Sequence, residues 1–250
     1  MSLLGVQRHG SGPPLVWFHG FTQTKDSAHR FRSILTGTNE LLTLDLPGHG
    51  ENATILASLD ETADLLAEVL PGEPFALGGY SFGARVALHF ALHYPARVNR
   101  LVLLGATRGI MDPLERDERR RSDDALAQRI ESIGADAFLD EWLARAMFAS
   151  LPNDPLERAA RSSHAAGLAG SLRLAGTGTQ RWLATELASL SMPTLALAGA
   201  LDQKFRLEAT AIAENVVDGR AKFVADAHHA AHLEQPERSA ELVQRFTRQL

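Results

Sequence analysis

One short stretch carries a candidate nucleophile. Residues 78–85 read GGYSFGAR, and Gly79, Ser81 and Gly83 fit the pattern G-x-S-x-G. The apolar run 75–77 precedes this stretch and an amphipathic pattern follows it, so the local order is strand, sharp turn and helix. Such a turn needs small neighbours, which the two glycines supply. We therefore predict that Ser81 is a reactive serine.

The serine needs partners, because a hydroxyl is a poor nucleophile or base at neutral pH. A histidine must take its proton, and an acid must orient that histidine. In a strand–turn–helix setting of this kind, the acid and then the histidine follow the serine along the chain. Asp202 comes just after the apolar run TLALAG, where a strand should end, although a turn or helix-cap aspartate would occupy the same place. Asp202 is the predicted acid.

Three neighbouring histidines are candidates for the base. The segment KFVADAHHAAHLEQP contains His228, His229 and His232. The common pattern Gly-His-x-x-His-x-x-x-Pro, aligned on the proline, makes His229 the base and His232 an accessory residue. His228 stands where glycine is usual and remains the alternative base. No metal is expected, because the chain has no cysteine, no H-E-x-x-H and no clear carboxylate as third ligand.

Charge that develops on a substrate oxygen needs two backbone donors. One should be the N–H of Phe82, directly after the nucleophile. The other should come from the loop WFHGFTQT, where the N–H of Phe21 fits. Other polar residues at these strand ends, His19, Asp45 and His49, are predicted to be structural.

Arg85 poses a question about the substrate. It follows Ser81 by four residues, so on a helix both lie on one face, one turn apart. A guanidinium beside the nucleophile suits a carboxylate, which it binds through two parallel hydrogen bonds. Arginine is abundant here, with 22 arginines against 3 lysines, so number alone proves nothing and a helix-exposed Arg85 is the alternative.

The elements that must position these residues alternate along the chain. Short apolar runs, bounded mostly by Gly, Pro or Asp, alternate with helical patterns, which predicts a mostly parallel sheet with helices on both faces. In such sheets ligands bind at the carboxyl ends of the strands. The apolar runs are residues 15–18, 41–44, 75–77, 101–104, 194–197 and 222–224, and the helical patterns include 58–70, 82–94, 206–216 and 236–250.

One region breaks the alternation. Between about residues 107 and 185 the pattern is helical and rich in charge, with no convincing strand. We interpret residues 107–185 as an all-helical cap over the strand ends, and residues 1–106 and 186–250 as the α/β core. More helices packed on a sheet face would be the alternative.

The composition of the chain argues against a nucleic-acid-binding protein and against a membrane protein. The 250-residue chain has a net charge of −5, which does not favour nucleic acid or a membrane surface. No apolar stretch approaches the ~18 residues of a membrane span, and the N-terminus has no signal-like core. A cytoplasmic protein without membrane insertion is expected; the oligomeric state is left open.

The motifs HGF, DLPGHG, GYSFGAR, GALDQKF and HHAAHLEQP occur in the order typical of the α/β-hydrolase superfamily, which the chain resembles over nearly its whole length. A narrower resemblance rests on GYSFGAR, ERDERRRSD, FLDEWLARAMFASLPND, LRLAGTGTQ and LDQKFR. These resemble the 2-succinyl-6-hydroxy-2,4-cyclohexadiene-1-carboxylate synthases of menaquinone biosynthesis. Members of that family eliminate pyruvate, use Ser-His-Asp as a base and need no cofactor.

The narrower resemblance also implies the residues that bind the polycarboxylate substrate. They are Tyr80, Arg85, Arg119, Trp142 and Arg161, with Arg158 as the alternate for Arg161. A solvated or locally paired arginine is the alternative at 119 and 161, and a core position is the alternative for Trp142. Two other functions stay open: a hydrolase for esters or carbon–carbon bonds of an acidic substrate, and a non-catalytic ligand-binding protein.

Overall fold

The computed structural model describes residues 4–248 and contains one seven-stranded sheet. The strand order is β1-β3-β2-β4-β5-β6-β7, and all neighbours pair in parallel except β1 with β3. The predicted mostly parallel sheet is therefore confirmed, and the short antiparallel edge strand β1 is an element that the apolar runs did not indicate. The strands are β1 Gln7–His9, β2 Pro14–Phe18, β3 Glu40–Thr43, β4 Phe75–Tyr80, β5 Val98–Leu104, β6 Thr194–Gly199 and β7 Gly219–Val224.

Helices cover both faces of the sheet. On one face α2, α3 and α8 pack against the strands, and on the other lie α1, α9 and α10. The α-helices are α1 His29–Leu35, α2 Leu59–Val69, α3 Phe82–His93, α4 Pro113–Ile133, α5 Ala135–Leu143, α6 Pro155–Ala159, α7 Ala165–Ala175, α8 Gln203–Asn215, α9 Ala231–Glu234 and α10 Pro236–Thr247. The 3₁₀ turns are η1 Gly50–Asn52, η2 Pro95–Arg97, η3 Ala146–Phe148 and η4 Leu187–Ser189.

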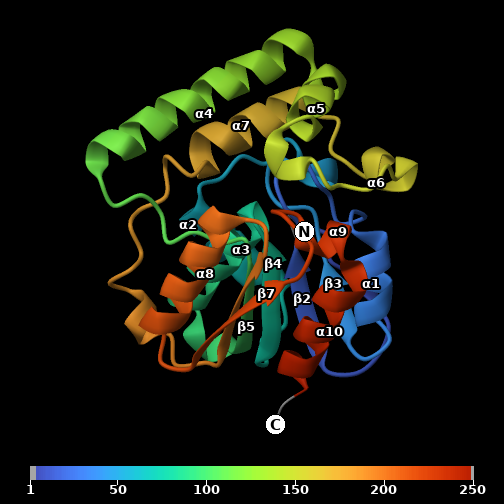
Figure 1. Cartoon of the computed structure of the whole chain (residues 1–250), viewed down its shortest axis with the longest axis vertical. Coiled ribbons are helices and arrows are strands. Elements are labelled where there is room, and N and C mark those ends of the chain that lie inside the picture. Colours follow the sequence, from blue (N-terminus) through green and yellow to red (C-terminus); the bar gives the residue numbers. More distant parts are fainter. Residues whose placement is uncertain (1–3, 249–250) are drawn as a thin grey trace.

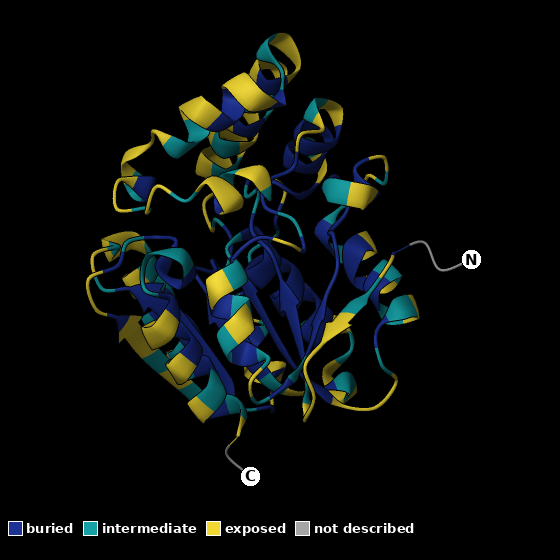
Figure 2. Cartoon of the chain, turned by 90° about the vertical axis from the view of Figure 1, so that its right-hand side faces the viewer, coloured by how far each residue is buried: buried dark blue, intermediate teal, exposed yellow. Residues whose placement is uncertain are grey.

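The continuous apolar runs of the strands have a direct structural cause. Successive side chains of a strand point to opposite faces, and here both faces are covered. In β5, Leu101 and Leu103 enter the core under α3, while Val102 and Leu104 enter the core on the other face. Figure 2 shows the buried strands between helices whose outer faces are exposed.

Helices α4 to α7 all lie between β5 and β6 in the chain and beyond the carboxyl ends of the strands (Figure 1). Residues 107–185 contain no strand. The Asp112 side chain accepts hydrogen bonds from the first backbone N–H groups of α4, and Gly134, with φ 82°, ends it. Ile130 of α4, Phe138 of α5 and Leu168 of α7 form a separate small core. This packing supports the interpretation of the segment as a cap, whose exact limits stay a prediction.

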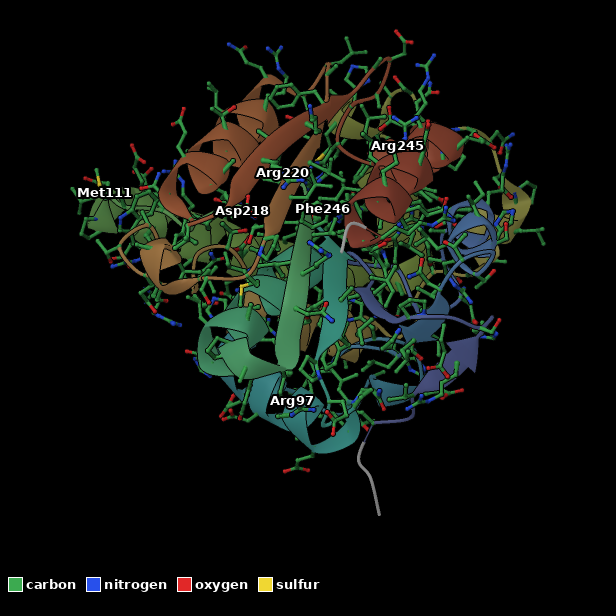
Figure 3. All side chains as sticks on the ribbon, turned by 90° about the horizontal axis from the view of Figure 1, so that it is seen from below. Arg97, Met111, Asp218, Arg220, Arg245 and Phe246 are labelled. Atoms are coloured by element: carbon green, nitrogen blue, oxygen red, sulfur yellow. The ribbon has the colours of Figure 1, made fainter. Side chains whose placement is uncertain are left out.

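Several arginines lie at the end of the molecule opposite the cap, among them Arg97, Arg220 and Arg245 (Figure 3). Arg97 donates to Ala67 O at 2.8 Å and Leu70 O at 2.9 Å, which satisfies carbonyl groups at the end of α2. Arg220 lies over the Phe246 ring at 5.8 Å. No helix of the described part of the chain is long and apolar enough to cross a membrane.

Candidate active site

Ser81 lies on the sharp turn between β4 and α3. Its backbone has φ 51° and ψ −105°, a conformation that side-chain-bearing residues rarely adopt and that costs roughly 1–3 kcal/mol. The turn brings backbones very close: a Cβ on Gly83 would lie 2.4 Å from Phe18 O, and one on Gly79 would lie 2.5 Å from Gly83 C. The two glycines of the motif are therefore required, because a side chain at either position would collide with neighbouring backbone atoms. The strained backbone of Ser81 holds its hydroxyl at the tip of the turn.

Asp202, His229 and Ser81 form a continuous polar chain. His229 Nδ1 lies 3.1 Å from Asp202 Oδ2, and His229 Nε2 lies 3.1 Å from Ser81 Oγ. A carboxylate only accepts, so Nδ1 donates to it and Nε2 is left to accept the serine proton. His229 is 3% exposed. The geometry is that of a serine whose proton can be removed.

Asp202 is suited to remain ionised. It caps α8 and accepts from Phe205 N at 3.2 Å. Burial by itself would raise the pKa of Asp202, but the hydrogen bonds from His229 and Phe205 N outweigh it and hold the pKa below its usual range. The charged acid therefore fixes the tautomer of His229.

The neighbouring histidines point elsewhere. His228 Nδ1 lies 2.7 Å from Ser150 Oγ in the cap and 3.5 Å from Glu234 Oε2. His232 is buried behind the site with its ring 4.2 Å from the Tyr80 ring, and burial lowers its pKa to about 3. Of the three histidines, only His229 has a ring nitrogen within hydrogen-bond distance of Ser81 in the described structure.

Phe21 and Phe82 line the same cavity as Ser81. The N–H of Phe82 opens α3, where the helix dipole favours negative charge. The assignment of Phe21 and Phe82 N–H as donors to an oxyanion stays a prediction.

The polar residues predicted to be structural make structural contacts. His19 Nε2 accepts from Leu46 N at 3.0 Å, and Asp45 accepts from Lys25 N at 2.8 Å. His49 Nδ1 lies 3.0 Å from Pro47 O, and its ring stacks on Phe82. They hold the loops around Phe21 and Phe82, which are the predicted oxyanion donors.

A cavity of about 660 Å³ opens above Ser81, between the strand ends and the cap. Its wall is strongly cationic, with five basic side chains against two carboxylates. The basic residues are Arg85, Arg119, Arg129, Arg145 and Lys204, and the acids are Asp123 and Asp202. Such a wall favours a ligand with several negative charges.

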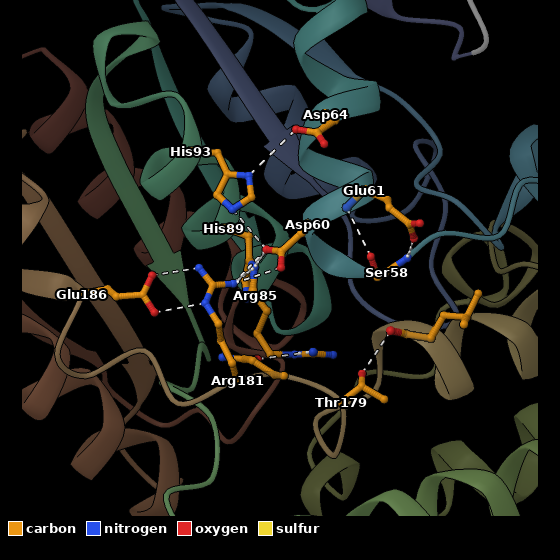
Figure 4. Close-up of polar contacts among 12 residues, drawn as sticks. Ser58, Asp60, Glu61, Asp64, Arg85, His89, His93, Thr179, Arg181 and Glu186 are labelled. Carbon is orange, nitrogen blue, oxygen red and sulfur yellow. Dashed lines mark hydrogen bonds and ion pairs between the residues drawn. The ribbon is translucent and has the colours of Figure 1, made fainter.

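Arg85 is buried on the Ser81 side of this cavity. Its Nη1 donates to Ala175 O at 2.8 Å and to Gln180 Oε1 at 3.4 Å, both at the C-terminal end of the cap. Arg85 is labelled in Figure 4 together with His89, which follows it by one turn of α3. Within residues 4–248 no carboxylate lies within ion-pair distance of Arg85. Burial, with the nearby Arg119, lowers the pKa of Arg85 to about 10, so it is still cationic at neutral pH. The exposed-helix alternative does not hold.

The other predicted binding residues divide between two cavities. Tyr80, Arg119 and Trp142 line the cavity above Ser81. Arg119 Nε is held by Asp123 Oδ1 at 2.8 Å, and the Trp142 ring meets Phe21 edge-on at 5.3 Å. Burial raises the pKa of Tyr80 well above its usual range, so its hydroxyl stays protonated.

Arg161 lies in a second cavity, of about 650 Å³, near α1, α6 and α9. Its Nη1 donates to Thr22 Oγ1 at 2.8 Å, and its Nη2 lies 3.9 Å from Glu157 Oε1. The alternate, Arg158, lines the same second cavity and pairs with Asp140. Phe148 borders both cavities. Arg161 thus does not line the Ser81 cavity itself, because the short helix α6 is anchored over α1 through Glu157 and Ala28 N. Its positive charge is nevertheless close enough to act on Tyr80, which does line that cavity.

Three basic cavity residues were missed by the sequence reasoning: Arg129, Arg145 and Lys204. Lys204 follows Asp202 by two residues, in the first turn of α8, and Arg145 follows Trp142 by three residues, at helical spacing. These spacings were the signals in the sequence that could have indicated Lys204 and Arg145. Among the described residues, no group of three or more His, Cys, Asp or Glu side chains could hold a metal ion.

Comparison with known proteins shows which family has this architecture. Residues 9–242 match the alpha/beta hydrolase family. The chain belongs to that family. It is 32% identical to 2-succinyl-6-hydroxy-2,4-cyclohexadiene-1-carboxylate synthase of Escherichia coli O1:K1, over 94% of this chain and 95% of that protein. The predicted family resemblance is thereby confirmed.

Solved structures agree with this assignment. The structure of MenH from S. aureus has a TM-score of 0.90 and 29% identity, and 98% of each chain is covered. An esterase from Thermogutta terrifontis, solved with malate bound, has a TM-score of 0.82 and 26% identity, with 98% of this chain and 93% of that chain covered. This member of the alpha/beta hydrolase family thus resembles both a synthase and an esterase.

Proposed function

We propose that this protein is a lyase, 2-succinyl-6-hydroxy-2,4-cyclohexadiene-1-carboxylate synthase of menaquinone biosynthesis. It would eliminate pyruvate from 2-succinyl-5-enolpyruvyl-6-hydroxy-3-cyclohexene-1-carboxylate. The names of full-length relatives support this, and so does the resemblance to MenH. The observation that carries the proposal is the aligned Ser81–His229–Asp202 chain opening into a cavity lined by five cations.

The first step is the removal of a proton from the ring carbon beside the succinyl carbonyl. Ser81 Oγ, whose own proton passes to His229 Nε2, would take that proton. The electron pair left on carbon delocalises onto the carbonyl oxygen, where the N–H groups of Phe21 and Phe82 stabilise it. Asp202, held ionised, stabilises the imidazolium that forms.

The second step breaks the carbon–oxygen bond to the enolpyruvyl group. The electron pair returns from the carbonyl oxygen, the ring gains its second double bond, and enolpyruvate leaves and becomes pyruvate on protonation. The leaving fragment carries a carboxylate, and so do the ring and the succinyl group. Arg85 lies one helical turn from Ser81 and would hold one of these carboxylates, with Arg119 holding another. No cofactor takes part in this scheme.

The proposed partner is thus a small polycarboxylate molecule. Tyr80 and Trp142 both line the cavity and would contact its ring. Arg161, in the second cavity, is proposed to act on the substrate only where the ligand extends past Phe148. The cytoplasmic location remains a prediction.

A lyase and a hydrolase differ in whether oxygen from solvent water enters a product. Pyruvate release is measured by coupling to lactate dehydrogenase, and the products are analysed by mass spectrometry after reaction in ¹⁸O-labelled water. We expect one pyruvate per conjugate, with no label beyond what control incubations of the products acquire by exchange. Stoichiometric incorporation of label, or an acyl group on Ser81, would instead identify a hydrolase for an acidic substrate.

A further inference from the structure

The basic residues of the Ser81 cavity differ in what already neutralises them. Arg119 Nε is 2.8 Å from Asp123 Oδ1, and Arg129 Nε is 3.2 Å from Glu141 Oε2. Arg85 donates to two neutral acceptors and is almost wholly buried. These contacts fix three of the five cations in place before any ligand binds.

Arg145 is held in a different way. It follows α5, and its guanidinium carbon lies 4.4 Å from the centroid of the Trp142 ring. Across residues 4–248 its guanidinium has no hydrogen bond and no ion pair. Stacking on the tryptophan covers one face of the planar group and leaves the N–H groups at its edge free. The orientation is therefore set without use of the donors.

The surroundings of Arg145 lack a compensating acid. Arg145 is an exposed residue, but partial burial of its guanidinium and the like charge of Arg119 lower its pKa. The carboxylate of Glu141, which acts in the opposite direction, is already bound by Arg129. Lys204 is also without a salt bridge in the described structure, but it lies beside Asp202 and helps to hold that acid ionised. Arg145 is the cavity cation with most capacity left for an anion.

We propose that Arg145 binds a substrate carboxylate, as a planar anchor held against Trp142 at the cap side of the cavity. The identity of that substrate rests on the proposed function. A carboxylate fits because its two oxygens can accept the parallel N–H bonds that the edge of a guanidinium offers. Arg145 would then select for substrates with a carboxylate beyond those held by Arg85 and Arg119.

Binding is measured directly, so that the result does not depend on turnover. Ser81→Ala protein is titrated with the enolpyruvyl conjugate by calorimetry, alone and combined with Arg145→Gln, Arg145→Lys or Arg120→Gln. Arg120 is the matched control, because it lies on α4, is 57% exposed and pairs with Asp117 outside the cavity. Each variant should keep its melting temperature, since the Arg145 side chain makes no hydrogen bond or ion pair within the described residues.

We expect Arg145→Gln to weaken binding by about 10- to 100-fold, the range for a charge-assisted hydrogen-bonded pair. Arg145→Lys should recover part of the loss, because it restores charge but not the planar edge. Arg120→Gln should change the dissociation constant by less than about twofold. In the active enzyme, which retains Ser81, Arg145→Gln should raise KM far more than it lowers kcat. Steady-state measurements of pyruvate release check this.

An unchanged dissociation constant in Arg145→Gln, or equal losses in Arg145→Gln and Arg120→Gln, overturns the inference. Failure of the proposed function gives a different result: the wild-type protein would bind the conjugate but release no pyruvate. The titration would still show whether Arg145 contributes to binding. If the Ser81→Ala protein binds no conjugate at all, both proposals are wrong.

Discussion

Replacement of Arg85 by alanine gives the sharpest test of how the cavity recognises its ligand. Among residues 4–248, Arg85 donates through Nη1 alone, to Ala175 O and Gln180 Oε1, so Nε and Nη2 are available to a carboxylate. The residue is 8% exposed and has no acidic partner in residues 4–248, which makes the substrate its expected counter-ion. Two charge-assisted hydrogen bonds are worth roughly 1.5–3 kcal/mol each.

Two bonds to one group are not fully additive, so we expect a net loss of about 3–4 kcal/mol in transition-state binding. This corresponds to a fall in kcat/KM of about 100- to 1,000-fold for the acidic substrate. Arg85→Lys should recover only part of it. The alanine variant leaves Ala175 O and Gln180 Oε1 without their donor, but it also removes a buried charge, so the melting temperature should move by only a few degrees.

The assay is steady-state pyruvate release, with the melting temperature of each variant as the check on folding. Arg245→Ala serves as the control, because Arg245 lies at the opposite end of the molecule, is 74% exposed and pairs with Glu241 (Figure 3). It should keep kcat/KM within about twofold. If a folded Arg85→Ala protein processes the acidic substrate as well as the wild type does, the assignment of Arg85 as a carboxylate anchor is refuted.

Three further predictions concern the groups around Ser81. His229→Ala should lower kcat by several orders of magnitude while its neighbour, His228→Ala, keeps most activity, and the reverse ranking in the same assay would move the base to His228. Asp202 has a depressed pKa, so the stability it contributes relative to Asp202→Asn should be present at neutral pH and disappear as the pH falls through the folded-state pKa, below about pH 4; denaturant titrations from pH 7 to 3 measure this. Gln180→Leu should impair catalysis through Arg85, so adding it to Arg85→Ala should lower kcat/KM little further, whereas additive losses would show an independent role.

Much of the site followed from the sequence because it depends on local order. A serine between two glycines after a strand can only lie on a tight turn, and an acid or histidine directly after a strand must lie at the same edge of a parallel sheet. The positions of Ser81, Asp202 and His229 relative to the strands were therefore readable from residue spacing. The alternating apolar runs likewise fixed the parallel sheet, since each run needed two covered faces.

Tertiary packing decided the rest. His228 and His229 are adjacent, and the path of the backbone between β7 and α9 is what turns one toward Ser81 and the other toward Ser150 in the cap. Arg161 and Arg145 illustrate the same limit. Each lies on a short segment of the cap whose direction depends on contacts with residues far away in the chain, such as Thr22 for Arg161 and Phe21 beneath Trp142. A side chain's spacing in sequence gives its face on its own helix, but the cavity that this face borders is set only when the cap packs on the sheet.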